Sequence, residues 1–163
     1  MPVNRLIRVV SAFFASACVG YLLASILFTS ANLIRLSEVG ADISFNDALR
    51  TVWFDLRGLA PSLLWNQYGS LIFIALAIAF PVGALLRSFA IRANVPAIAP
   101  FLYPLAGATA MIVILVLSYQ KYEVYAFAGA RGWLGNFAQC FAGACAGYLF
   151  HLLSSSSPSE ARP

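Results

Sequence analysis

Few side chains in this sequence could carry chemistry. Its 163 residues include one histidine, three cysteines and six acidic residues. Axial ligation of a pigment or haem needs a single imidazole, so His151 is a candidate ligand, although nothing beside it in the sequence identifies such a site. Cys18, Cys140 and Cys145 lack the CxxC or other zinc-ligand spacing, and we predict no metal site.

The acidic residues offer no catalytic set. Five of them lie between the predicted spans: Glu38, Asp42, Asp47, Asp55 and Glu123. None is paired in the sequence with a histidine or a nucleophile, so we predict that the protein is not an enzyme. Arg131 precedes the last apolar segment, where the free backbone N–H groups of a helix start favour an anion. It is a candidate contact for a lipid phosphate.

A membrane-spanning fold must position these residues. Hydrophobic residues make up 61% of the chain and charged residues 10%, against roughly 25% charged residues in soluble domains. The charges leave four windows, 9–34, 58–86, 93–120 and 132–159, each longer than the roughly 20 residues of a transmembrane helix. We predict an all-α membrane protein with one domain, residues 1–153, and four transmembrane helices in a compact bundle. The spans are expected at 9–29, 69–88, 97–119 and 133–153, followed by a polar, disordered tail at 154–163.

The basic residues predict how the first span and the termini are placed in the membrane. Arg5 and Arg8 before the first apolar segment resemble a signal peptide, but this segment exceeds the roughly 7–15 apolar residues of a signal sequence, so we expect a retained span. Arg87 and Arg92 fill a short connection on the side of both termini, which predicts cytoplasmic termini. Because the opposite side holds as many basic residues, insertion in both orientations stays open. The arginine-rich, compact connections favour a bacterial inner (cytoplasmic) membrane.

A charged amphipathic segment separates the first two spans. Apolar residues in 45–58 recur with helical spacing, which predicts an interfacial helix with one apolar stripe. The stripe contains Phe45, Leu49, Val52, Trp53 and Leu56. Ser44 is the expected N-cap, and Gly58 with Pro61 is the expected stop. Two roles are open: the helix tethers the connection to the lipid surface, or it docks on a partner subunit or on the outer end of the bundle.

Two rows of small residues predict close helix packing. The first span carries Ala12, Ser16, Gly20 and Ala24, and the last carries Gly135, Gln139, Gly143 and Gly147. Helices in lipid associate through close backbone approach across such rows. We expect the first and last spans to meet each other, or another chain, along them. Gln139 is expected to donate a hydrogen bond to a neighbouring helix, with a transport role as the alternative.

These features favour a protein that works through its surfaces. We expect an accessory, assembly or stabilising subunit of a larger inner-membrane complex, acting through helix–helix packing. The alternative is a small oligomeric transporter or channel. The expected partners are membrane lipids and either other membrane subunits or further copies of the chain. No basic run is present that would bind nucleic acid. Bound lipid is the expected non-protein component, and no cofactor is predicted beyond the hypothesis for His151.

Overall fold

The computed structural model describes residues 3–58, 68–122 and 133–155. These ranges are helical and contain no strand, which confirms the predicted all-α class for the described part of the chain. The helices are α1 (Val3–Glu38), α2 (Phe45–Gly58), α3 (Tyr68–Arg92), the short 3-10 helix η1 (Pro96–Phe101), α4 (Leu102–Tyr122) and α5 (Trp133–Ser155).

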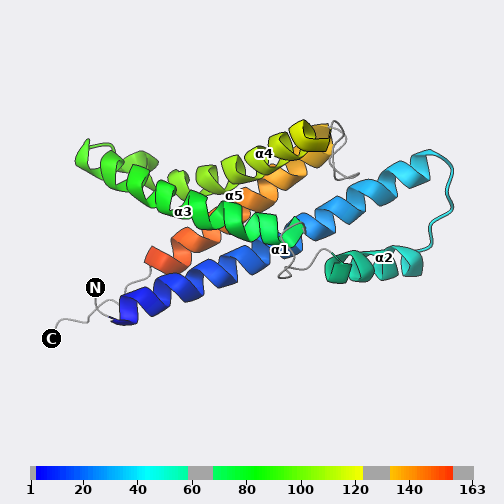
Figure 1. The fold of residues 1–163 in the computed structure, drawn as a ribbon, viewed down its shortest axis with the longest axis horizontal. Coiled ribbons are helices and arrows are strands. Elements are labelled where there is room, and N and C mark those ends of the chain that lie inside the picture. The colour runs from blue at the N-terminus through cyan, green and yellow to red at the C-terminus, as the bar shows by residue number, and fades with distance from the viewer. Residues whose placement is uncertain (1–2, 59–67, 123–132, 156–163) are drawn as a thin grey trace.

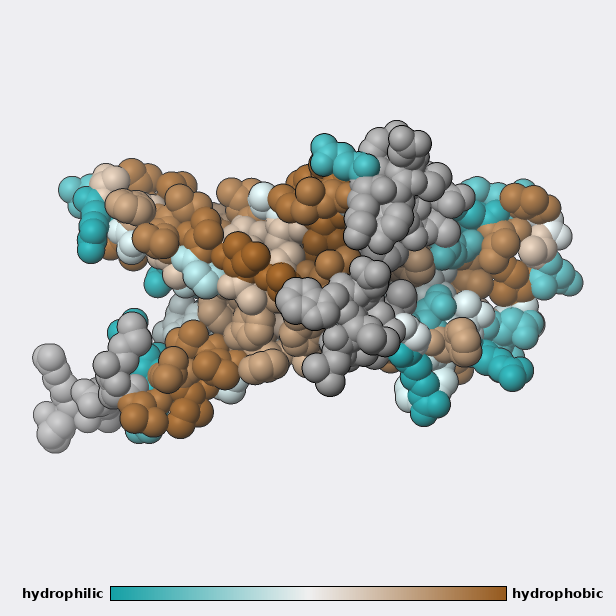
Figure 2. All heavy atoms as spheres, viewed as in Figure 1, coloured by the Kyte–Doolittle hydropathy of each residue, from teal (hydrophilic) through white to brown (hydrophobic). Residues whose placement is uncertain are grey.

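Four helical segments are long and apolar enough to cross a membrane. They are Val3–Glu38, Gly69–Arg92, Pro96–Ser118 and Trp133–Ser155. Large apolar side chains on their outer faces are exposed, among them Ile78, Val113 and Phe141, and apolar residues cover much of the surface seen in Figure 2. Because lipid replaces water around such faces, these helices indicate an integral, multi-pass membrane protein.

Two helix ends follow from the same local geometry. The N–H of Ala41 bonds the carbonyl of Leu36, and the N–H of Gly40 bonds that of Ser37. This is a Schellman motif, in which the left-handed residue is Gly40, at φ 88°. α3 ends in the same way with Asn94, at φ 57°. α1 therefore ends at Glu38, just before the left-handed Gly40, and not at the expected position 29.

The helices pack around α5. α5 contacts both α1 and α4, while α3 packs on α4 and, less extensively, on α1 (Figure 1). Large side chains fill the core mainly from α3, which contributes Ile72, Leu76 and Phe80. Small residues of α1 and α5, such as Ala17 and Ala142, are fully buried opposite them. Close backbone approach therefore holds one side of the bundle, and large apolar side chains fill the other.

α1 extends past the ends of the other spanning helices. In Figure 1 its C-terminal part projects beyond α3, α4 and α5, and α2 returns beside this projection. Contacts between α1 and α2 confirm that the two lie side by side. We call these two segments, the projecting part of α1 and α2, the α1–α2 hairpin. It forms one end of the molecule, and the N-terminal end of α1 lies at the opposite end.

Candidate functional site

The small-residue rows lie inside the bundle. Ala12, Ser16, Gly20 and Ala24 of α1 are buried, as are Gly135, Gln139, Gly143 and Gly147 of α5. Gly20 faces α5, because a Cβ added there would lie 2.8 Å from Cβ of Ala146. α1 and α5 therefore approach each other closely at Gly20 and Ala146; Ala146 is next to the Gly147 of the row rather than part of it.

Gly143 and Gly147 face a different helix from the one expected. A Cβ added at Gly143 would overlap the main chain of Gly107 in α4, and one at Gly147 would overlap the main chain of Tyr103. Gly107 was not among the packing residues predicted from the sequence. The sequence does contain an indication of this contact, which is the run of three small residues at 106–108 in the third span. α5 thus uses one small face against α1 and another against α4, and both are occupied within this chain.

Gln139 joins α5 to α1. Its side chain is 1% exposed, and its Nε2 donates to the main-chain carbonyl of Ala24 at 3.1 Å. A helical carbonyl has a second lone pair, so this bond adds to the α1 helix without breaking its own hydrogen bond. The bond places the amide between two helices.

Two side-chain hydrogen bonds attach α2 to α1. The Tyr21 hydroxyl donates to the carbonyl of Leu56 at 2.5 Å. The Thr29 hydroxyl lies 2.8 Å from Oδ2 of Asp55 and 3.0 Å from the carbonyl oxygen of Ser25. Leu56 also packs against the apolar core. These contacts fix the C-terminal half of α2 against α1.

The apolar stripe of α2 is only partly covered. Val52 and Leu56 are half-buried on the α1 side. Phe45, Leu49 and Trp53 are 82%, 59% and 57% exposed, and Phe54, which the sequence analysis left off the stripe, is 76% exposed. The guanidinium of Arg57 lies 4.8 Å from the centre of the Trp53 ring. We call these four exposed apolar side chains, Phe45, Leu49, Trp53 and Phe54, the α2 ridge. Phe45, Leu49 and Trp53 follow one stripe of the helix, and Phe54 lies beside Trp53, about 100° further around the helix.

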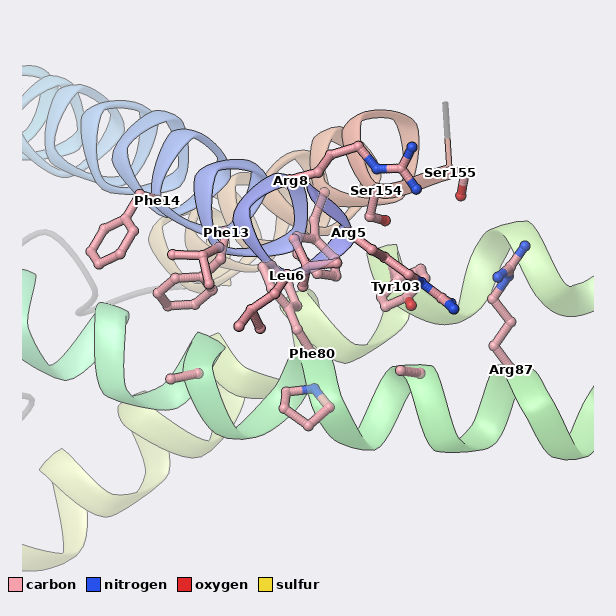
Figure 3. Close-up of a pocket in the computed structure, with 16 residues that line it drawn as sticks. Arg5, Leu6, Arg8, Phe13, Phe14, Phe80, Arg87, Tyr103, Ser154 and Ser155 are labelled. Atoms are coloured by element: carbon pink, nitrogen blue, oxygen red, sulfur yellow. The ribbon is translucent and has the colours of Figure 1, made fainter. Parts of the chain in front are cut away.

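A cavity of about 910 Å³ lies at the opposite end of the molecule. It is lined by the start of α1, by α3, and by residues of α4 and α5 (Figure 3). Three arginines line it, Arg5 and Arg8 from α1 and Arg87 from α3, together with aromatic side chains. Figure 2 shows the molecule notched between the start of α1 and the end of α3. The sequence predicted that these arginines lie on one side of the membrane, but it did not predict that they line one cavity.

The remaining sequence candidates lie apart. The ring of His151 stacks on Tyr103 with centroids 5.9 Å apart, and its Nδ1 lies 3.2 Å from Oγ of Ser155. Ligation of a pigment or haem by His151 stays a prediction. Ser154 and Ser155 belong to α5 rather than to the expected tail. Arg131, Pro61 and the rest of the tail lie outside the described residues.

The described residues contain no cluster of three or more histidine, cysteine or acidic side chains that could hold a metal ion. Comparisons with protein-family models, with curated proteins and with solved structures found no match.

Proposed function

We propose that this protein is an accessory, assembly or stabilising subunit of a larger membrane complex, and that the α2 ridge is the surface that binds a partner subunit. One observation supports this most strongly. α2 is fixed to α1 near its C-terminal end by Tyr21 and Thr29, and it leaves four large apolar side chains exposed. A helix held in this way loses little further conformational entropy when a partner covers these side chains.

The composition of the ridge suits a protein partner. Aromatic side chains and arginine are enriched at the centres of protein interfaces, and the ridge combines Phe45, Trp53 and Phe54 with the neighbouring Arg57. The hairpin projects past the ends of α3, α4 and α5 (Figure 1), so a partner can reach the ridge without displacing the bundle. We propose that α2 lies at the outer membrane interface and that the partner contacts the ridge there.

The packing of the spans favours this proposal over a transporter or channel. Gln139, the polar side chain proposed to line a path, bonds to Ala24. α3, α4 and α5 contain no acidic residue, whereas ionisable groups inside the membrane are the usual mark of proton or ion pathways. The small faces of α5, which an oligomeric pore would use between chains, are covered by α1 and α4.

The proposal includes a location. The arginines near the start of α1 and the end of α3 are dense on the side of the N-terminus. By the positive-inside rule, this side lies in the cytoplasm and the α1–α2 hairpin on the opposite side. The proposed compartment is the inner membrane of a bacterium.

Extraction from native membranes in a mild detergent tests the proposal. Bound proteins are quantified by mass spectrometry for the wild type, for a Phe45→Ser, Phe54→Ser double variant, and for Phe101→Ser. Phe101 is 69% exposed and lies in η1, outside the ridge, so it serves as a matched control. We expect a foreign subunit at constant stoichiometry with the wild type and the control, and its loss from the double variant. Isolation of the wild type alone, or as a homo-oligomer, would contradict the proposal.

A further inference from the structure

We propose that the cavity between the start of α1 and the ends of α3, α4 and α5 binds an anionic phospholipid. The phosphate would lie between Arg5 and Arg87, and an acyl chain would follow the aromatic wall. This site is at the end of the molecule opposite the α2 ridge, so the inference does not depend on the proposed partner subunit.

The first argument is charge. Arg5, Arg8 and Arg87 line one cavity, and none of the described residues that line it carries a carboxylate. The acidic residues within the described ranges are confined to 38–55, at the α1–α2 hairpin. Three like charges around one space repel one another, and a bound anion offsets this repulsion. The lining of the cavity therefore favours a negatively charged ligand.

The second argument is the hydrogen-bonding capacity of the arginines. The Nε of Arg87 is buried and has no hydrogen-bond partner among the described residues. A buried donor without a partner is costly, so a ligand oxygen at this position would be stabilising. Figure 3 shows Arg5 and Arg87 extending from α1 and α3 toward the same part of the cavity, beside Tyr103. The planar guanidinium fork matches the geometry of phosphate oxygens.

The third argument is the apolar wall, which a free inorganic anion would not need. Beyond the arginines the cavity is lined by Leu6, Phe13, Phe80, Pro81 and Phe150. The rings of Phe80 and Phe150 stack with centroids 4.4 Å apart, and Phe13 meets Phe80 edge-on at 6.1 Å. A volume of about 910 Å³ falls within the roughly 300–1,000 Å³ of small-molecule sites. The cavity can hold a headgroup with part of one chain.

Basic pockets between transmembrane helices are a known mode of anionic headgroup binding. Here the arginines lie near the start of α1 and the end of α3, and the aromatic wall includes Phe80 and Phe150 of the buried core. Charge, donor geometry and the apolar wall therefore select one ligand class, a phosphate-bearing lipid.

The test measures lipid retained by the purified full-length protein. The protein is equilibrated in mixed micelles with equal amounts of dioleoyl phosphatidylglycerol and dioleoyl phosphatidylcholine, and bound lipid per protein is quantified by mass spectrometry. We expect phosphatidylglycerol to be retained preferentially. Arg5→Gln and Arg87→Gln should each lower its binding about fivefold. Arg92→Gln, with the same loss of charge on α3 but outside the cavity lining, should leave it unchanged.

A second pair of variants tests the acyl-chain part without changing charge. Ala84 lines the cavity, so Ala84→Trp should fill it and lower phosphatidylglycerol retention. Leu85 is its neighbour, is 57% exposed and does not line the cavity, so Leu85→Trp is the control. This pair tests whether an acyl chain occupies the cavity, even if the Arg87→Gln variant fails to fold.

Three results would overturn the proposal. The first is equal retention of the two lipids by the wild type. The second is an equal loss with Arg92→Gln and Arg87→Gln, which would indicate a general effect of net charge. The third is displacement of bound lipid by millimolar inorganic phosphate together with unchanged binding in Ala84→Trp, which would indicate a small-anion site.

Discussion

The side-chain amide of Gln139 in α5 donates a hydrogen bond to the main-chain carbonyl of Ala24 in α1, at 3.1 Å. This bond lies at a buried contact, where Ala24 is 0% exposed and Gln139 is 1% exposed. In lipid a polar side chain has few other partners, so the contact favours one register of α1 against α5.

Replacement of Gln139 tests this role. Gln139→Leu keeps most of the side-chain volume and removes the donor, so we expect a loss of about 0.6 kcal/mol of unfolding free energy, the average for such bonds in membranes. The measurement is an SDS titration of the purified protein followed by circular dichroism. Asn136→Leu is the control, because the Asn136 Oδ1 atom is buried without a hydrogen-bond partner among the described residues, and its removal should cost less. A larger loss for Asn136→Leu would refute this assignment.

The approach of α4 to α5 predicts a strong effect at Gly143. In Gly143→Ala the added Cβ would overlap the main chain of Gly107 and lie 2.5 Å from Cγ of Met111. Because the main chain cannot yield without moving a helix, we expect a destabilisation of about 1–3 kcal/mol in the same titration. Gly58→Ala, where nothing lies within 4 Å of the added Cβ, should be neutral or slightly stabilising. Equal stability of the two variants would show that α4 and α5 are farther apart than described.

Removal of one hydroxyl group should weaken the attachment of α2 to α1. Thr29→Val removes the donor to Asp55 and keeps the shape of the side chain. Loss of about 1 kcal/mol at this contact corresponds to about fivefold faster deuterium exchange of the α2 amides. Thr51→Val is the matched control, because the Thr51 hydroxyl bonds the carbonyl of Asp47 within α2 itself. Exchange that is unchanged in Thr29→Val, or equally faster in Thr51→Val, would argue against the α1–α2 attachment.

The number of spans could be predicted from the sequence because charged residues are costly in lipid and leave long windows free. The helix ends could not, since α1 continues through polar residues until Gly40 adopts a left-handed conformation. Ser44 could be predicted as the cap of α2, and the structure has the hydrogen bond from the Asp47 N–H to its Oγ. Local rules of this kind act over a few residues and are readable in a linear sequence.

Contacts between distant segments were harder to predict. A row of glycines identifies a flat helix face but does not identify the helix opposite, which is why Gly107 was missed as the partner of Gly143. The arginine cavity depends on the arrangement of α1 and α3, which brings Arg5 and Arg87 to one cavity although they are far apart in the sequence. The α2 ridge differs from the predicted stripe because Val52 and Leu56 are half-buried and Phe54, which lies beside the stripe, is exposed.

The most direct test of the central claim is a photo-crosslink from the ridge in the native membrane. Leu49, which is 59% exposed at the middle of the ridge, is replaced by a benzophenone-bearing amino acid, and the crosslinked products are identified by mass spectrometry. The proposed function predicts one crosslinked foreign membrane protein, and its loss when Phe45 and Phe54 are also changed to Ser. Crosslinks to lipid alone, or to a second copy of this chain, would contradict the claim that the α2 ridge binds a partner subunit.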